Sequence, residues 1–577
     1  MVPEDLRNFA DARDIDEFVD GLRRFEQGIL SAEEFRRFRL ARGTYGQRQS
    51  DVHMIRVKIP QGILQAAQLD RIADVCERFS RGFGHVTTRQ NIQIHFIQMA
   101  DVPEVQRLLA EVGLTTREAC GNTVRNVTGC PLAGTCKDEP FDVTPYGEAV
   151  TRAYLRHPSF GDLPRKFKIA FSGCAHDCAQ GAINDVGCIA RIEGGVHGFR
   201  VIVAGGLSTS PENAHVLFAF LPADQLLGVI EAALMVFDRL GNRKNKARAR
   251  LKYVVRKLGW EGFRAEFDKA WAEVEAAGRK VRPIAPDKRS SKLVAAPAAP
   301  AAGAPPRGLL QFRASNVLAQ RQPGYASVIV RLVRGDATAT EWRALAAIAR
   351  QHGDGTVRLT NDQNAILRFV PEASVRALYE DLEAAGLGKA DARTIADVTS
   401  CPGADTCNLA VTQSRELALA LTAALEAPNG HAEAVRAASS LDIKISGCPN
   451  SCGQHHVAAI GFHGTMKRVG DRTVPEYQLH LGGGIGADGA EFGRQIVKVP
   501  ARRTADALIR LLELYLRERK EGEAALAFFR RVDEAAVKAA VVDLSAIDEQ
   551  SARPEDFIDL GEQEGFKVAI GEGECAT

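Results

Sequence analysis

The sequence is poor in aromatic residues and carries almost no excess of charge. Phe, Trp and Tyr make up 6% of its 577 residues, and the formal net charge is +2. So small a charge argues against a nucleic-acid-binding protein, and few aromatic rings are available to stack on bases. No apolar run approaches the roughly 20 residues that a membrane-spanning helix needs. The polar first segment, MVPEDLRNFADARDIDEF, does not resemble a secretory signal, so we expect a cytoplasmic protein without nucleic-acid or membrane partners.

Cysteine, by contrast, is present in a repeated arrangement. Eight of the 12 cysteines form two quartets, each a C-x5-C turn followed by a C-x3-C turn. The first quartet is Cys130, Cys136, Cys174 and Cys178, and the second is Cys401, Cys407, Cys448 and Cys452. In a reducing compartment such a pattern indicates metal binding rather than disulfides. A gap of five residues fits zinc sites poorly, because their paired ligands are usually two to four residues apart, and it favours an iron–sulfur cubane.

The quartets repeat because the whole chain is an internal duplication. The segment IRVKIPQGILQAAQLDRIADVCERFSRGFGHVTTRQNIQIHFI resembles VIVRLVRGDATATEWRALAAIARQHGDGTVRLTNDQNAILRFV. Each predicts a strand, an amphipathic helix, a Gly turn and a second strand. We therefore predict an α+β fold with pseudo-twofold symmetry, in which each half is a small module followed by a larger α/β module. A site between the halves is the natural consequence.

The ends of the chain and its middle differ in composition from the modules. The segment AAPAAPAAGAPP suits a semi-rigid linker, and the acidic, Gly-rich stretch after about residue 550 predicts disorder. The predicted divisions are 1–50 (an N-terminal helical wrap), 51–115 (first small module), 116–284 (first large module), 285–308 (Ala/Pro linker), 309–390 (second small module), 391–545 (second large module) and 546–577 (C-terminal tail).

The second quartet carries a specific family resemblance. TSCPGADTC together with KISGCPNSCGQ resembles the cluster signature of the sulfite and nitrite reductase hemoproteins, and the likeness runs from about residue 35 to about residue 545. It implies ferredoxin-like small modules and larger modules that bind siroheme and a 4Fe-4S cluster, coupled through the thiolate of Cys452. It implies an oxidoreductase that reduces sulfite to sulfide, with reduction of nitrite to ammonia as the alternative. Electrons then come from a separate ferredoxin or flavoprotein.

The resemblance also assigns roles to polar residues. The substrate-contacting residues by the family's pattern are Arg89, Arg125, Lys166 and Lys168, and the siroheme-contacting residues are Arg165, Gln363, Asn450 and Cys452. Aligning the halves places Asp362 opposite Arg89 and Asp442 opposite Lys168, so only the first half supplies the cations. Lys168 resembles the sulfite type more than the Asn of plant-type nitrite reductases, and a second ammonium group favours the more highly charged sulfite dianion.

The first quartet departs from the compared family members, which have no full quartet there. Three interpretations stay open: a second 4Fe-4S cluster, with or without a siroheme on Cys178; free thiols left over from the duplication; or another metal. The complete spacing favours a cluster, and the absence of cations opposite it predicts a structural or electron-relay centre. Two rival functions are a non-catalytic iron–sulfur electron-transfer protein and a zinc protein. The cation set argues against the first, because electron transfer alone needs no anion pocket, and the gap of five residues argues against the second.

Two smaller predictions concern single residues. Cys76 lies in an apolar helical pattern and is expected in the core, whereas Cys575 in the tail is expected to be free. His455 and His456 follow Cys452 closely, and we interpret them as residues that support the cysteine ligands or pack beside them, rather than as metal ligands themselves.

Overall fold

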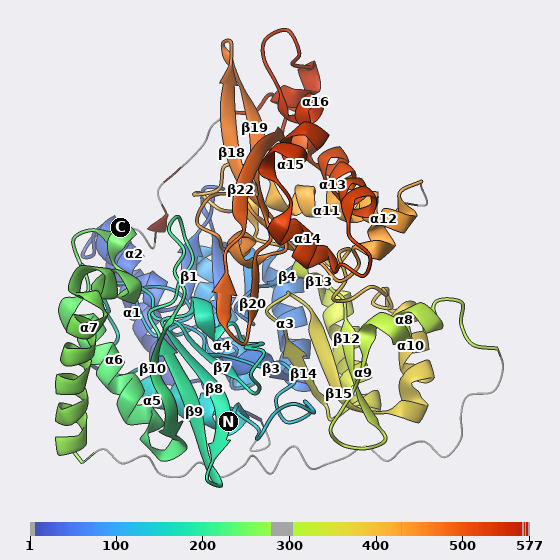
Figure 1. The fold of residues 1–577 in the computed structure, drawn as a ribbon. Coiled ribbons are helices and arrows are strands. Elements are labelled where there is room, and N and C mark those ends of the chain that lie inside the picture. Colours follow the sequence, from blue (N-terminus) through green and yellow to red (C-terminus); the bar gives the residue numbers. More distant parts are fainter. Residues whose placement is uncertain (1–5, 279–303, 428–429, 568–570, 572, 575–577) are drawn as a thin grey trace.

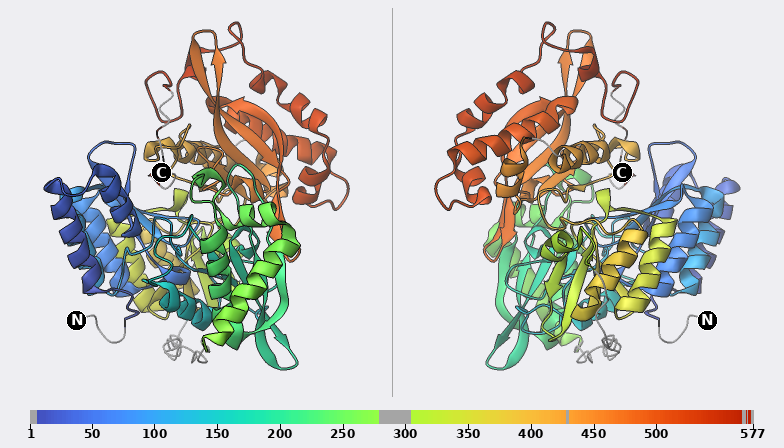
Figure 2. Two further views of the ribbon diagram at one scale, coloured as in Figure 1. Left: turned by 90° about the vertical axis from the view of Figure 1, so that its left-hand side faces the viewer. Right: turned by 90° about the vertical axis from the view of Figure 1, so that its right-hand side faces the viewer.

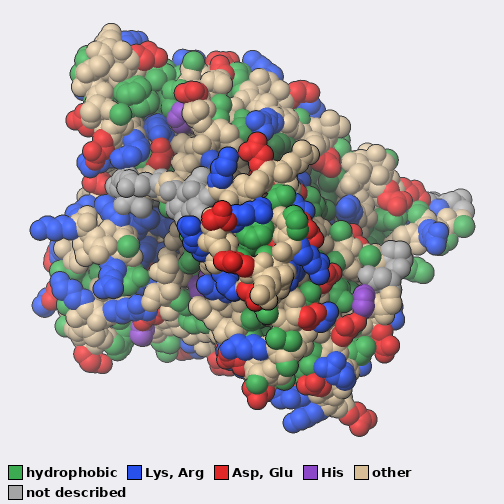
Figure 3. All heavy atoms as spheres, turned by 90° about the horizontal axis from the view of Figure 1, so that it is seen from above, with side chains coloured by type: hydrophobic (Ala, Val, Ile, Leu, Met, Phe, Trp, Pro, Cys, Tyr) green, Lys and Arg blue, Asp and Glu red, His purple; other side chains and the backbone are tan. Residues whose placement is uncertain are grey.

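The computed structural model describes residues 6–278, 304–427, 430–567, 571, 573 and 574 (Figure 1). Most of the predicted linker and Cys575 lie outside this range. No helix within it combines the length and the apolar composition needed to cross a membrane. Acidic and basic side chains are intermixed over the face seen from above in Figure 3.

The two small modules form one unit. Their elements are β1 (Thr44–Gly46), β2 (Val52–Val57), β3 (Ile63–Gln65), α3 (Ala66–Phe79), β4 (Phe83–Val86), β5 (Ile92–Gln98) and α4 (Val102–Glu111), then α8 (Leu309–Asn316), β11 (Val317–Ala319), β12 (Tyr325–Val330), β13 (Asp336–Thr338), α9 (Ala339–His352), β14 (Thr356–Leu359), β15 (Ala365–Pro371) and α10 (Val375–Ala384). The sheet orders are β1-β2-β5-β4-β13 and β11-β12-β15-β14-β3. Each half therefore gives its partner's sheet a fifth strand.

Helices α3 and α9 pack against each other beneath these sheets, and a single hydrophobic core contains residues of both halves. In α3 the apolar residues Leu69, Ile72, Ala73 and Cys76 recur at helical spacing and are fully buried, which explains why this segment is a helix and why it packs here. The core position predicted for Cys76 is confirmed.

The two large modules repeat one sheet topology. The first contains β6 (Thr128–Gly129), α5 (Thr144–Tyr154), β7 (Ile169–Ser172), β8 (Val186–Glu193), β9 (Val196–Val203), β10 (His215–Pro222), α6 (Leu226–Leu240) and α7 (Leu251–Ala276). The second contains β16 (Thr399–Ser400), α11 (Ser414–Glu426), α12 (Ala432–Ala437), β17 (Ile443–Ser446), β18 (Ile460–Val469), β19 (Arg472–Leu481), β20 (Gly484–Gly486), β21 (Gly489–Glu491), β22 (Arg494–Pro500), α13 (Thr504–Glu518), α14 (Ala525–Arg531), α15 (Glu534–Ala540) and α16 (Val542–Ser545). In both sheets the first two pairings are parallel and the next two antiparallel. The predicted α+β duplication is confirmed, and Figure 2 shows the second large module above the joined small modules, with the first large module beside them.

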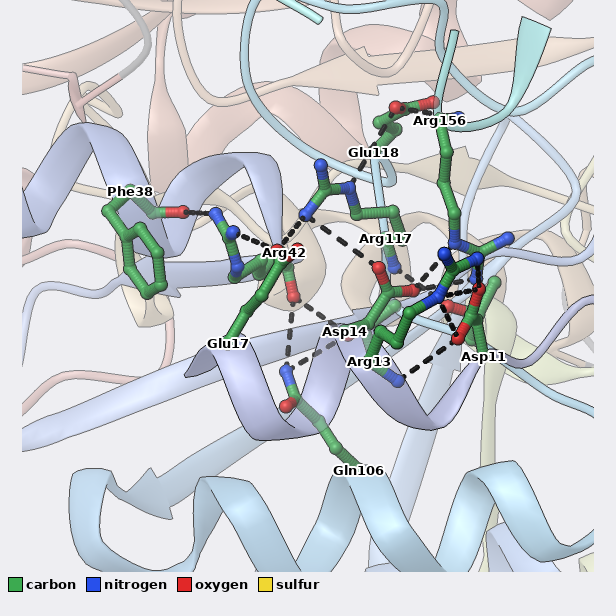
Figure 4. Close-up of polar contacts among 12 residues, drawn as sticks. Asp11, Arg13, Asp14, Glu17, Phe38, Arg42, Gln106, Arg117, Glu118 and Arg156 are labelled. Carbon is green, nitrogen blue, oxygen red and sulfur yellow. Dashed lines mark hydrogen bonds and ion pairs between the residues drawn. The ribbon is translucent and has the colours of Figure 1, made fainter. Parts of the chain in front are cut away.

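The N-terminal segment is helical, as predicted, and ion pairs hold it to the body. Asp14 of α1 (Ala12–Glu26) pairs with Arg156 at 2.6 Å, and Glu17 pairs with Arg117 at 3.3 Å (Figure 4). Helix α2 (Ala32–Ala41) follows, with a capping box formed by Ser31 and Glu34.

The prediction of a disordered tail is wrong for the described residues after 550. Phe557 packs with Val469 and Val474, and Arg503 Nε donates to the buried Asp556 at 2.9 Å. Composition misled the prediction because a few apolar and paired residues anchor an otherwise acidic segment.

Candidate functional site

The second quartet is assembled by two neighbouring parallel strands. The C-x5-C turn begins where β16 ends, and the C-x3-C turn begins where β17 ends. Ser400 and Ile445 are register partners, and Cys401 N donates to Ile445 O at 3.1 Å. Because the carboxyl ends of parallel strands share one edge of a sheet, both thiol pairs emerge together.

The surroundings of these thiols suit a metal cluster. Gly447 N donates to Cys401 Sγ at 3.2 Å, and Ser414 Oγ lies 3.4 Å from the same sulfur. Burial, followed by the charges of Cys452 and Cys401, raises the pKa of Cys407 to about 12. Thiols that raise one another's pKa ionise together only when a cation lies among them. A backbone N–H that donates to a sulfur, as Gly447 does to Cys401, also tunes the reduction potential of a cluster bound there.

The first quartet repeats this geometry. Gly129 of β6 and Phe171 of β7 are partners, and Cys130 N donates to Phe171 O at 2.8 Å. The sulfurs of Cys174 and Cys178 are 3.7 Å apart. Hydrogen bonds with Cys130 and Cys174 raise the pKa of the Cys178 thiol, so at least three of these sulfurs are in contact. The structure thus brings each predicted quartet together, and every cysteine in it is a free thiol.

Four cations of the first half are predicted to contact substrate. Arg89 lies in the turn between β4 and β5, where its guanidinium donates to Asn184 Oδ1 at 2.7 Å and Asn126 O at 2.6 Å. Arg125 donates to carbonyl oxygens of the segment before β6. Both guanidinium groups are thus held by neutral acceptors, which position them without cancelling their charge.

Lys166 and Lys168 lie just before β7, near these guanidinium groups. Burial and the charge of Arg165 lower the pKa of Lys166 to about 8, while the charge of Cys452 acts in the opposite direction. Burial, with the charges of Arg89 and Arg250, lowers the pKa of Lys168 well below its usual value. The first-half cations therefore lie within electrostatic reach of one another and of a second-half cysteine, an arrangement that an anion would relieve.

A direct contact joins the two parts of the site. Thr88, beside Arg89, donates from Oγ1 to Cys452 O at 3.0 Å. The cation-bearing turn of the first half and the cysteine-bearing turn of the second half therefore meet at Cys452.

A buried ion pair supports this pocket and was missed from the sequence. Arg250 donates to both carboxylate oxygens of Asp185, at 3.0 and 2.8 Å, and Asp185 also accepts the backbone N–H of Lys168 at 2.8 Å. Arg250 therefore fixes the Asp185 carboxylate, and the carboxylate in turn holds the backbone of Lys168 in place. The basic run around Arg250 was visible in the sequence, but nothing there indicated its partner.

The residues predicted to contact siroheme are more scattered. Asn450 Oδ1 accepts from Ser208 Oγ at 3.4 Å, and Arg165 lies 3.5 Å from Asn122 Oδ1. Gln363 is fully buried, and its amide bonds Ser400 N and Val86 O, both at 2.8 Å. The structure therefore places Gln363 behind the C-x5-C strand as a link between halves, and its cofactor contact stays a prediction.

A cleft of about 970 Å³ lies between the end of α6 and the start of α7. Its cationic lining residues are Arg239, Arg243, Lys244, Arg248, Arg256 and Lys257. Across the described chain, Lys244, Arg248 and Lys257 have no ion-pair partner, whereas the other three pair with carboxylates. The lining residues Thr209 and Ser210 follow Ser208, so the cleft edge lies near Asn450. A cofactor rich in carboxylates fits this charge.

The equivalent position in the other half is filled differently. Lys444 Nζ lies 3.1 Å from Asp362 Oδ1 and 3.7 Å from Asp442 Oδ2. Burial opposes ionisation, but these two carboxylates outweigh it and raise the pKa of Lys444. The residues equivalent to Arg89 and Lys168 thus form a closed ion triad that offers nothing to an anion.

Comparisons with known proteins agree with this organisation. The family model described as "Nitrite and sulphite reductase 4Fe-4S domain" matches residues 120–274 and 391–543. The model described as "Nitrite/Sulfite reductase ferredoxin-like half domain" matches residues 45–112 and 318–385.

Alignments with individual relatives extend over most of the chain. Sulfite reductase (ferredoxin) of Mycobacterium tuberculosis is 33% identical over 82% of this chain and 80% of its own length. Ferredoxin–nitrite reductase of Leptolyngbya laminosa is 32% identical over 77% of this chain and 82% of its own length. The solved structure of the Mycobacterium tuberculosis NirA protein, 29% identical, covers 91% of this chain and 97% of its own, with a TM-score of 0.75.

Proposed function

This chain belongs to the nitrite and sulphite reductase family, and on that premise we propose that it reduces sulfite to sulfide, with nitrite reduction as a second activity of the same site. The family predicted from the cluster signature is confirmed, and its cofactors are siroheme and a 4Fe-4S cluster. Converting sulfite to hydrogen sulfide takes up six electrons and eight protons and releases three water molecules. Converting nitrite to ammonium takes up the same numbers and releases two.

The residues that would hold the cofactors lie around Cys452. Cys401, Cys407, Cys448 and Cys452 would hold the cubane, and by the family's pattern Cys452 would also hold the siroheme. The cationic cleft and Arg165 suit the siroheme carboxylates. Once bound, the two groups supply an iron that takes the oxyanion and a store of electrons beside it.

The chain's own side chains bind and orient the anion. Arg89 and Arg125, fixed by neutral acceptors, present guanidinium groups with undiminished charge. Lys166 and Lys168 hold protons at Nζ within the same group of cations, and we propose them as donors of the protons that the reaction takes up. Asp185 positions Lys168 through its backbone N–H.

The observation that carries this proposal is that the first-half cations lie beside Cys452 of the second half. Thr88, next to Arg89, donates to Cys452 O, and burial lowers the pKa of Lys166 while the charge of Cys452 acts in the opposite direction. An electron-transfer protein needs no such anion pocket. The test is to compare kcat/KM for sulfite and nitrite with one reduced donor. We expect sulfite to be preferred, and a nitrite preference of about tenfold, roughly 1.4 kcal/mol, would reverse the assignment.

The donor is proposed from the relatives, which are named for ferredoxin. We expect turnover with a reduced ferredoxin and none with NADPH alone; turnover with NADPH alone would contradict this. The free thiols of the described cysteines support a cytoplasmic location.

For the first quartet we propose a second 4Fe-4S cluster that transfers electrons and does not bind substrate. Two observations support it: the converging sulfurs and the ion triad around Lys444. Counting iron and acid-labile sulfide per chain in anaerobically purified protein tests it. Two cubanes plus one haem iron are expected, and one cubane plus one haem iron contradicts the second cluster.

A further inference from the structure

Four histidines gather beside the C-x3-C turn of the second half. His455 and His456 lie in the 3-10 turn η10 (His455–Val457), His463 in β18 and His480 in β19. Because His463 pairs with Gln478 and His480 with Gly461, the two imidazoles lie diagonally on one face of the ladder. The ring centre of His455 is 4.8 Å from those of both His463 and His480.

These imidazoles are buried with too few hydrogen-bond partners. His455 and His480 are 0% exposed and His463 is 9% exposed. His463 Nδ1 and His480 Nε2 are 2.8 Å apart, but within the described structure neither nitrogen of His455 has a hydrogen-bond partner. A buried polar nitrogen without a hydrogen bond destabilises the fold, so two of them in one side chain require an explanation.

The duplicated half shows that the fold does not need histidine here. At the positions equivalent to His455, His463 and His480, the first half has Gly181, Ile189 and Ile202. Ile189 and Ile202 are buried and form an apolar cluster with Ala182, the equivalent of His456. The same backbone is therefore stable with aliphatic side chains, and replacing them by imidazoles has no packing rationale.

We propose that His455, His463 and His480 bind a divalent first-row transition-metal ion, with zinc as the reference case. One ring nitrogen of each residue lies within 4.8 Å of the others. Zinc–nitrogen bonds are about 2.0–2.1 Å long, so small side-chain shifts bring the three nitrogens around one ion. Imidazole is a ligand that zinc, copper, nickel and iron all accept.

Burial of the three rings favours their neutral form. Burial, followed by the neighbouring histidines' charges, lowers the pKa of His480 to about 3, and burial lowers that of His463 to about 4. The rings are therefore neutral near pH 7, which is the form that binds metals. This assignment replaces the packing role that the sequence suggested for His455.

The ion would join three segments, η10, β18 and β19, through the side chains of His455, His463 and His480. The turn η10 follows Cys452 directly, and a Cβ atom at Gly461 would meet His455 O at 2.0 Å, so the turn lies tight against β18. A metal shared by η10, β18 and β19 would fix the turn that carries Cys448 and Cys452. The inferred role is structural support of the cluster turn.

The test uses untagged, full-length protein purified anaerobically with its cofactors in place. Wild type, His480→Gln and the double variant His463→Ile/His480→Ile, which copies the first half, are incubated with zinc, freed of excess ion and analysed for zinc and iron. His352→Gln is the matched control, because His352 is a buried histidine that pairs with Asp381 at 2.6 Å in another module.

Among preparations of equal iron content, we expect about one more zinc ion per chain in wild type and His352→Gln than in the two cluster variants. Zinc should also raise the midpoint of thermal unfolding in wild type and not in the variants. Cysteines that lack their clusters also bind zinc, and comparing preparations of equal iron content keeps this contribution the same. Equal zinc content in wild type and the variants, or none in wild type, overturns the proposal.

Discussion

Gln454 Nε2 donates a hydrogen bond to Gln180 Oε1 at 2.5 Å, and the two residues occupy equivalent positions in the duplicated chain. Each lies two residues after the last cysteine of its C-x3-C turn. Both have a left-handed backbone conformation, with φ of 61° at Gln180 and 66° at Gln454. The two cysteine-bearing turns therefore touch directly at the pseudo-twofold axis. Clusters bound at the two turns would therefore lie near each other, which favours electron transfer between them.

Removing this contact should loosen the junction between the halves. We expect Gln180→Ala and Gln454→Ala each to destabilise the protein by about 1 kcal/mol, and the double variant to lose less than the sum, because the shared hydrogen bond is lost only once. Chemical denaturation followed by the loss of cofactor absorbance measures this. Gln180→Ala combined with the exposed Gln311→Ala is the control and should be additive; additivity in both pairs would show that the bond contributes nothing.

Much of this organisation was predictable from the sequence because duplication leaves a periodic record. The cysteine spacing and the matched strand–helix segments predicted the symmetry, the two quartets and the cations that the second half lacks. Strands β3 and β13 were not predicted, since each is three residues long and exists only because the other half's sheet edge accepts it. Local pattern carries no information about such an exchange.

Partners brought together by tertiary packing were also invisible. Asp185 and Arg250 are separated by 65 residues, and Lys444 meets Asp362 across 82. In the sequence, nothing links His463 of IGFHGTMKRV to His480 of RTVPEYQLHL. Only the register of β18 and β19 shows that they face the same space as His455.

Lys168→Asn should reduce sulfite turnover more than nitrite turnover. The variant removes one ammonium group from the anion pocket, and losing a charge-assisted contact costs about 1.5–3 kcal/mol, or roughly 10–100-fold in kcat/KM. Nitrite carries a single negative charge, so we expect a smaller loss for it. Steady-state kinetics with both anions and one donor measures the two ratios.

The control for this comparison is Lys538→Asn, which changes an exposed lysine paired with Glu534 in α15. It should leave both activities unchanged. Equal losses for the two anions in Lys168→Asn would refute the charge argument, even if the variant is less active.

Cys452→Ser and Cys178→Ser form a second matched pair, because they are equivalent cysteines in the two halves. Cys452→Ser should abolish most sulfite reduction, since this thiol is the proposed bridge to siroheme. Cys178→Ser should lower iron and sulfide content while siroheme remains bound. Optical spectra and metal counts on both variants decide the matter, and full activity in Cys452→Ser would mean that another cysteine is the bridge.

Asp397 gives the protein a pH dependence whose sign follows from its burial. Asn364 Nδ2 and Arg393 N donate to its carboxylate at 2.7 and 2.9 Å, and Arg331 lies 3.7 Å away. Burial nevertheless raises the pKa of Asp397 from 3.8 to about 6, against the lowering effect of Arg331. Between these two pH values the folded state binds more protons than the unfolded state, so stability falls as pH rises through this window and stays lower above it.

Asp397→Asn should therefore stabilise the protein at neutral pH. The asparagine keeps the shape and most of the hydrogen bonds but has no charge to bury. A pKa shift from 3.8 to about 6 corresponds to about 3 kcal/mol in the free energy of unfolding, and this is an upper limit because Arg331 loses a partner. The difference in unfolding midpoint between variant and wild type should grow from pH 4 to pH 6 and then level off. The exposed Asp506→Asn is the control and should show no such growth. A difference that is constant with pH, or a variant less stable than wild type at pH 7, would mean that the ion pair with Arg331 outweighs the burial of the carboxylate.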